Sequence, residues 1–161
     1  MKSPVRLAAF LGTVALVRSL EAGAALPQQS PQLTASSQEL EQRDLPVSED
    51  DLRILVKARA LLETDAVWNR SDDRECADDE ASGKRSLFCA LQKACVDVLG
   101  VYEHRRVALQ EVRFAVEDAT RRQDFEHRLR DFNNLPTTRL TDIQRVLQVA
   151  TDRVKARLKH K

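Results

Sequence analysis

Apolar residues recur three and four positions apart in five segments of the chain, which is the spacing of one face of an α-helix. The pattern predicts helices over about 49–63, 86–99, 105–120, 123–132 and 139–158. No segment shows the strict alternation of a half-buried strand. The most regular stripe is in the last helix, at Leu140, Ile143, Leu147, Ala150 and Val154. We therefore expect an all-α fold, a compact bundle of four to five helices with a loop or a short β-hairpin between the first two.

Local signals mark the ends of these helices. Ser48 and Asp51 have the S-x-x-[DE] spacing of a capping box. Gly100 follows the second helix, at the position where glycine ends helices. Pro136 disfavours helix at the residue before it and separates the fourth predicted helix from the last. The predicted elements therefore agree with both the apolar period and the boundary residues.

The first 25 residues have the layout of a secretory signal peptide. Lys2 and Arg6 form a basic start, and an apolar run of 11 residues follows over 7–17. That run is shorter than the ~20 residues needed to span a bilayer. We expect cleavage near Ala24 or Ala25, no transmembrane segment after cleavage, and an exported protein, periplasmic or secreted.

The rest of the chain divides into a linker and a helical domain. Residues 26–47 are rich in Gln, Ser and Pro without a sustained apolar period, which predicts a flexible linker. The helical domain then covers 48–161. Its tail from 139 to 161 has seven Lys and Arg but no aromatic residue. Because nucleic-acid binders combine a basic face with interleaved aromatics, we expect no nucleic-acid partner.

Three features along the domain form a pattern: Trp68 at the end of the first helix, "CAL" at Cys89 opening the second, and the late block "DFNNLPTTRLTDIQRVLQVA". Together they resemble a widespread bacterial family of small domains of unknown function. The resemblance covers roughly 52–150, with Gln92 where the family usually has glycine and Asn134 where it usually has aspartate. It implies a compact, mainly helical domain and implies no activity.

Cys89 is the candidate for catalysis, because a thiol at a helix N-terminus has a lowered pKa. A thiol-dependent hydrolase would use Cys89 as nucleophile, with His104 or His127 as its base. No predicted strand follows to present that base, and neither histidine lies in a motif. We therefore favour a protein that is not an enzyme and keep the hydrolase as the alternative.

The three cysteines also predict a disulfide, since exported chains reach an oxidising compartment. Cys89 and Cys95 are about 9 Å apart along one helix, beyond disulfide reach. A bridge must therefore use Cys76, and both Cys76–Cys95 and Cys76–Cys89 stay open. Because Cys89 belongs to the helix start of the resembling family, the resemblance favours a core position for it and Cys95 as the partner of Cys76.

Scattered histidines and cysteines predict no metal site, and the absence of a glycine-rich phosphate loop predicts no cofactor. Trp68 is expected in the core, because a buried indole contributes a large apolar area, or in a ligand pocket with Cys89. The sequence thus favours a non-catalytic binding or envelope accessory protein, with an unknown protein or small ligand as partner. It would be a monomer, or a weak homodimer through the stripe at 140–154.

Overall fold

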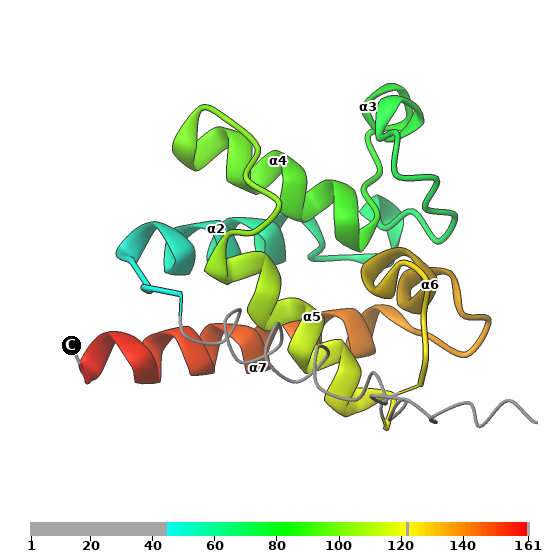
Figure 1. Cartoon of the computed structure of the whole chain (residues 1–161). Helices are drawn as coiled ribbons and strands as arrows, with labels where there is room; N and C mark the ends of the chain where they lie inside the picture. Colours follow the sequence, from blue (N-terminus) through cyan, green and yellow to red (C-terminus); the bar gives the residue numbers. More distant parts are fainter. Residues whose placement is uncertain (1–44, 122, 161) are drawn as a thin grey trace, which may run out of the picture. The chain divides into compact units, whose positions relative to one another are not determined.

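The computed structural model describes residues 45–121 and 123–160 (Figure 1). These residues form six α-helices and one 3₁₀ turn: α2 (Glu49–Leu61), η1 (Asp65–Val67), α3 (Ala77–Ser82), α4 (Leu87–Leu99), α5 (Val107–Ala119), α6 (Arg128–Asn134) and α7 (Leu140–Lys159). Within the same residues there is no strand, and a single isolated bridge pairs Trp68 with Arg85. The predicted all-α fold is confirmed.

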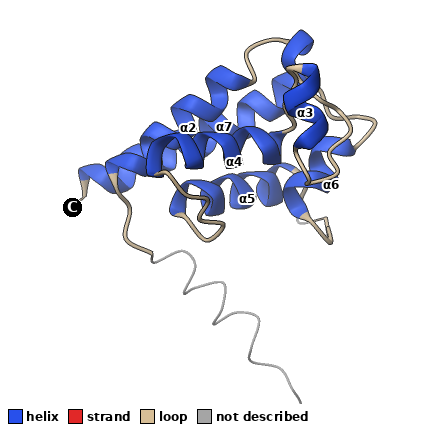
Figure 2. Cartoon of the chain, turned by 90° about the horizontal axis from the view of Figure 1, so that it is seen from above, coloured by secondary structure: helices blue, strands red, loops and turns tan. Residues whose placement is uncertain are grey.

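The longer helices pack around one core (Figures 1 and 2). α2 packs against α4 on one side and α7 on the other, while α5 lies across α7 and also contacts α6. The short helix α3 lies at the edge, in the acidic segment where the sequence predicted a loop or hairpin. The core therefore lies between α2, α4, α5 and α7, and α3 contributes no residue to it.

One buried carboxylate caps two helices. Asp51, in the first turn of α2, is fully buried, and its Oδ2 accepts from the Ser48 backbone N–H at 2.8 Å and from the Ser48 hydroxyl at 2.9 Å. Its Oδ1 accepts from the Ala108 backbone N–H at 3.1 Å and from the Arg106 guanidinium at 3.0 Å. The predicted capping box is confirmed, and the same side chain also holds the start of α5.

The ends of α4 lie close to those predicted from the sequence. The Ser86 hydroxyl oxygen accepts the Cys89 backbone N–H at 3.1 Å, which caps the first turn. Gly100 ends the helix with a φ of +78°, in the left-handed region that costs glycine little. The second predicted helix is therefore confirmed almost to the residue.

The fourth helix begins later than predicted, at Arg128 instead of near residue 123. The chain leaves α5 through Arg121, which has a φ of +53°. The Asp131 carboxylate then accepts the backbone N–H of His127 at 2.8 Å and so fixes the start of α6. Phe125 lies before the helix but still packs against the core, which explains why it extended the apolar pattern.

The last helix uses its apolar stripe inside the bundle. Leu140, Ile143, Leu147, Ala150 and Val154 are all buried, and α7 packs on α5 and α2. Asp142 accepts the Arg139 backbone N–H at 3.0 Å and caps the helix start. A homodimer through this stripe would have to expose it, so the stripe is not available as a dimer seam in this fold.

The predicted signal peptide, 1–25, and most of the predicted linker, 26–47, lie outside the described residues. The end of that linker is packed: Val47 is buried, and the Leu45 carbonyl accepts a hydrogen bond from Arg157. The described end of the predicted linker therefore packs against the helices. Over 45–121 and 123–160, no helix combines the length and apolar character that crossing a bilayer requires.

Candidate binding site

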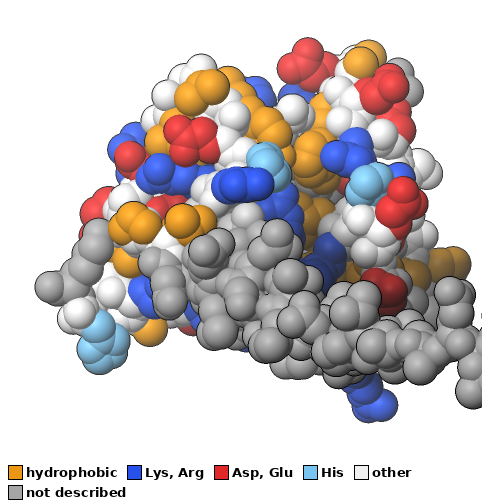
Figure 3. Space-filling model, viewed as in Figure 1, with side chains coloured by type: hydrophobic (Ala, Val, Ile, Leu, Met, Phe, Trp, Pro, Cys, Tyr) orange, Lys and Arg blue, Asp and Glu red, His pale blue; other side chains and the backbone are white. Residues whose placement is uncertain are grey.

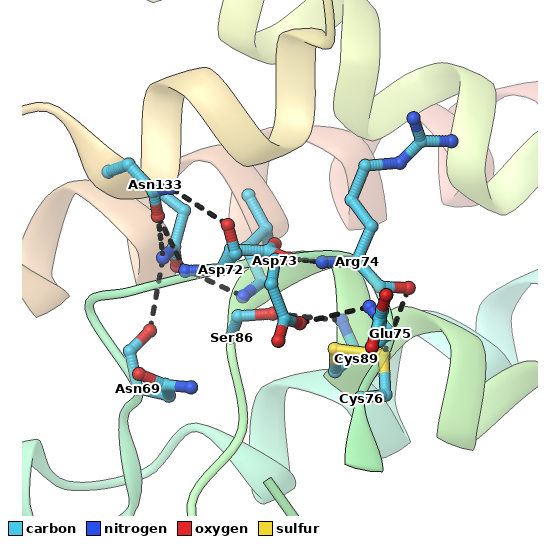
Figure 4. The surroundings of a disulfide bond; sticks show 11 residues. Asn69, Asp72, Asp73, Arg74, Glu75, Cys76, Ser86, Cys89 and Asn133 are labelled. Carbon is cyan, nitrogen blue, oxygen red and sulfur yellow. Dashed lines mark hydrogen bonds between the residues drawn. A yellow bond between two sulfur atoms is a disulfide. The ribbon is translucent and has the colours of Figure 1, made fainter. Parts of the chain in front are cut away.

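A disulfide joins Cys76, just before α3, to Cys89 in the first turn of α4 (Figure 4). The two sulfurs are 2.07 Å apart and the two Cα atoms 5.5 Å apart. The pairing that we preferred from the sequence, Cys76–Cys95, is therefore wrong. The structure has the other pairing that the sequence left open, Cys76–Cys89. Cys95 is a free, buried cysteine.

The geometry of α4 explains this outcome. Six residues turn a helix by about 600° and advance it by about 9 Å, so Cys95 faces away from the loop that contacts Cys89. The Cys95 sulfur lies 3.5 Å from the Val101 carbonyl oxygen and accepts the Glu103 backbone N–H at 3.4 Å. Burial raises the pKa of the Cys95 thiol, although the Glu103 N–H opposes this effect. Cys95 thus has the core position that the sequence assigned to Cys89.

Cys89 is at a helix N-terminus, as predicted, but it has no thiol. Its side chain is 2% exposed and its sulfur is bonded to Cys76. A thiolate nucleophile requires a free sulfur. In this form of the protein, Cys89 therefore stabilises the loop and cannot attack a substrate.

Asn133 of α6 connects the loop around the disulfide to the body of the domain (Figure 4). Its side-chain oxygen accepts the Trp68 indole N–H at 2.8 Å and the Leu87 backbone N–H at 3.0 Å. Its side-chain amide donates to the Asn69 carbonyl at 3.0 Å. Trp68 is only 4% exposed, so it is a core residue and its indole is not available to stack on a ligand.

A pocket of about 260 Å³ opens beside this junction, lined by the disulfide loop, α4, α5 and the start of α6. The face in Figure 3 shows basic and histidine side chains around a hollow, with hydrophobic side chains between them. The lining consists of five basic or imidazole residues, three apolar residues and one acid: Arg74, Arg113, Arg128, Arg130 and His127; Phe88, Phe125 and Leu129; Glu126. We call it the arginine pocket.

Arg74 reaches the arginine pocket from the disulfide loop. The Asp72 carboxylate accepts its backbone N–H at 2.7 Å, and its side chain extends away from the disulfide (Figure 4). The guanidinium Nη1 lies 2.9 Å from Nε2 of His127, and the guanidinium carbon lies 5.7 Å from the centre of the Phe88 ring. This distance is within the range of a cation–π contact. The disulfide loop therefore supplies one cationic wall of the pocket.

Arg113 joins the lining of the pocket from α5. Its guanidinium donates to the His104 carbonyl at 2.8 Å. Burial lowers the pKa of Arg113, and the nearby cations Arg128 and Arg74 lower it further, while Tyr102 acts in the opposite direction. A half-buried guanidinium next to like charges is an unfavourable arrangement that a bound anion would relieve.

The structure does not assemble the catalytic set that the hydrolase alternative requires. His127 lines the arginine pocket, whereas His104 lines a second pocket of about 490 Å³ between residues 45–46 and 102–107. Neither Cys89 nor Trp68 lines either pocket. Across the part of the chain that the structure describes, no group of three His, Cys, Asp or Glu side chains is placed to hold a metal ion.

The sequence did not single out the arginines of this pocket. They come from four positions between 74 and 130, each surrounded by other charges, so no local motif distinguishes them. The signal that could have pointed to them is weak: a charged segment, "EHRLR", that follows Phe125 before a helix. Their convergence is a property of the fold.

Comparison with known proteins gives one match. The profile of a family of unknown function (DUF6197) matches residues 46–153, which is 108 of the 161 residues. No curated protein and no solved structure matches the chain. The matched range begins near the first packed residues and ends within α7, so it spans the helical domain with its disulfide loop and the arginine pocket. The chain belongs to this family of unknown function.

Proposed function

We propose that the protein is a non-catalytic binding domain, and that the arginine pocket is its binding site. The observation that supports this proposal best is the Cys76–Cys89 disulfide, because it takes up the thiol of Cys89, the candidate nucleophile. The pocket is lined mainly by guanidinium groups and apolar side chains, with His127 and Glu126 beside them, and such groups hold ligands by charge and by contact area.

We further propose that the domain works outside the cytoplasm, as a periplasmic or secreted accessory protein. The signal-peptide layout of residues 1–25 supports this location. The disulfide also supports it, because such bonds persist in oxidising compartments and are rare in the cytosol.

Alkylation and mass mapping test the binding-domain proposal against the hydrolase. Trypsin separates the three cysteines, because Lys84 and Lys93 lie between them. Without reduction, we expect the peptide of Cys76 joined to that of Cys89, and Cys95 modified by iodoacetamide only after unfolding. A native protein in which Cys89 reacts with iodoacetamide and which hydrolyses ester substrates would refute the proposal and support the hydrolase.

Cell fractionation tests the location. The full chain expressed in a bacterial host should appear in the periplasm or the medium with a new N-terminus close to Ala25. Arg substitutions within the apolar run at 7–17 should keep it in the cytoplasm with Met1 or Lys2 at its start, because the run would no longer engage the export machinery. An uncleaved cytoplasmic chain in the unmodified protein would contradict export.

A further inference from the structure

Within the residues that the structure describes, two of the four arginines of the arginine pocket have carboxylate partners and two do not. Arg128 pairs with Glu117 at 3.0 Å and Arg130 with Asp131 at 2.7 Å, so these two cations already have carboxylate partners. Arg74 and Arg113 form no ion pair with any described residue; Arg74 contacts His127, and Arg113 donates to a backbone carbonyl. Over 45–121 and 123–160, these two guanidinium groups therefore have no carboxylate partner.

The apolar part of the pocket lies beside these two groups. Phe88 contacts the Arg74 guanidinium on one side, and its ring stands edge-on to Tyr102 with the ring centres 6.1 Å apart. Phe125 and Leu129 complete the apolar lining. A ligand that fills the pocket would thus place one end among guanidinium groups and the other against aromatic and aliphatic side chains.

We propose that the arginine pocket binds a small organic anion, in which a carboxylate or a phosphate monoester is attached to an apolar, ring-sized body. Arg74 and Arg113 hold the oxyanion, since the planar guanidinium fork matches both carboxylate and phosphate geometry. Phe88, Phe125 and Leu129 contact the body. The volume of about 260 Å³ is at the small end of ligand sites, which limits the occupant to a small molecule.

This inference rests on the proposed binding function and names the ligand class. A cation is disfavoured by the four arginines, and a neutral ligand would leave Arg74 and Arg113 without a counter-charge. The one acid of the lining, Glu126, is 80% exposed, and its carboxylate lies 3.8 Å from Nε2 of His127 and 3.7 Å from the Arg130 guanidinium. Among the described residues it forms no ion pair with Arg74 or Arg113.

Calorimetric titration of the full chain with its disulfide intact tests the proposal. The probes are phenyl phosphate and benzoate, with benzyl alcohol as the neutral analogue, benzylamine as the cationic one and inorganic phosphate as the anion without an apolar body. We expect saturable binding of phenyl phosphate, benzoate or both, weaker binding of inorganic phosphate, and no saturation by the other two. The preferred headgroup distinguishes a phosphate ligand from a carboxylate. Affinity should fall as NaCl rises, because salt screens the charges.

Variants locate the site. Arg113→Gln should raise the Kd of the bound probe by about tenfold or more, the loss expected for one strong charge-assisted contact. Arg74→Gln should also raise it, and because Arg74 lies on an exposed loop, this variant keeps the proposal testable if Arg113→Gln does not fold. Arg145→Gln is the matched control: its side chain is 73% exposed on α7 and outside the pocket, so the Kd should not change.

Three results would overturn the inference. The first is that neither organic anion binds saturably. The second is that benzyl alcohol binds as tightly as the organic anions. The third is that Arg145→Gln raises the Kd as much as Arg113→Gln does, which would indicate non-specific attraction. Saturable binding of a neutral ligand would refute the anionic ligand class but would leave the proposed binding function standing. A reactive Cys89 together with esterase activity would refute the proposed binding function itself. The alkylation experiment measures that outcome independently of the titrations.

Discussion

Asn133 and Asn134 are adjacent and chemically identical, yet their surroundings differ completely. Asn133 is fully buried, and its side chain satisfies the Trp68 indole N–H, the Leu87 N–H and the Asn69 carbonyl. Asn134 is exposed, and its side chain accepts the Asp72 N–H at 2.8 Å and donates to the Asp72 carbonyl at 2.9 Å. Its oxygen also accepts from the Asn133 amide at 3.1 Å. The first residue holds a buried junction, and the second fixes the backbone of Asp72 from the surface.

Replacement of these two residues should therefore have unequal effects. Asn133→Ala leaves two buried donors and one acceptor without partners, and should lower the free energy of unfolding by about 2–4 kcal/mol. Asn134→Ala removes part-buried hydrogen bonds to the Asp72 backbone and to the Asn133 amide, and should cost about 1 kcal/mol, because water can replace an exposed side chain at this position. Urea unfolding followed by circular dichroism measures both values, and equal losses would show that Asn133 does not have the role described.

At the scale of elements, the starts of α2 and α5 depend on the same side chain. The backbone N–H of Ala108 and the guanidinium of Arg106 meet one oxygen of Asp51, and Ser48 meets the other. A helix start leaves several backbone N–H groups without partners in the helix, so a buried start needs such an acceptor. Asp51 thus fixes how the two helices approach each other.

We expect Asp51→Ala to lower the free energy of unfolding by about 3 kcal/mol, because it removes both caps and leaves Arg106 without its buried partner. Asp50→Ala, next to it, removes only an exposed pair with Arg53 and should change stability by less than about 1 kcal/mol. Chemical denaturation of the two variants under the same conditions makes the comparison. A small loss for Asp51→Ala would mean that other groups cap α5.

The disulfide affects the stability of the whole domain, because it also links the two cysteines in the unfolded chain, where they are 13 positions apart. The double variant Cys76→Ser/Cys89→Ser should lose about 3 kcal/mol of unfolding free energy by the loop-entropy relation. The unmodified protein under a reducing agent should lose the same amount, whereas the double variant should not respond to the reducing agent. A stability that is independent of reduction in both proteins would contradict this account.

The sequence predicted the elements better than it predicted their contacts, for a physical reason. Ser48 and Gly100 act on the backbone within a few residues, so the start of α2 and the end of α4 could be placed from local signals. Phe125 misled the prediction of α6, because a residue that packs from a loop has the same hydrophobicity as one on a helix face. Local pattern carries information about local structure only.

The disulfide partner and the arginine pocket depend on the path of the loop over 69–84. That path is set by Asn133, which lies 64 residues beyond Asn69, and by the bridge between Trp68 and Arg85. Contacts at such separation leave no period or spacing in a single sequence. For the same reason, the resemblance to the family indicated the domain correctly but favoured the wrong partner for Cys76, Cys95 instead of Cys89.

The position of Trp68 has a practical consequence. It is the only tryptophan of the chain, it is buried, and its indole N–H is bonded to α6. Its fluorescence therefore originates from a single, known place, where the disulfide loop meets the helical body. If the loop separates from α6, water reaches the indole and its emission moves to longer wavelength. The protein thus contains its own optical reporter of whether this junction is closed, without any added label.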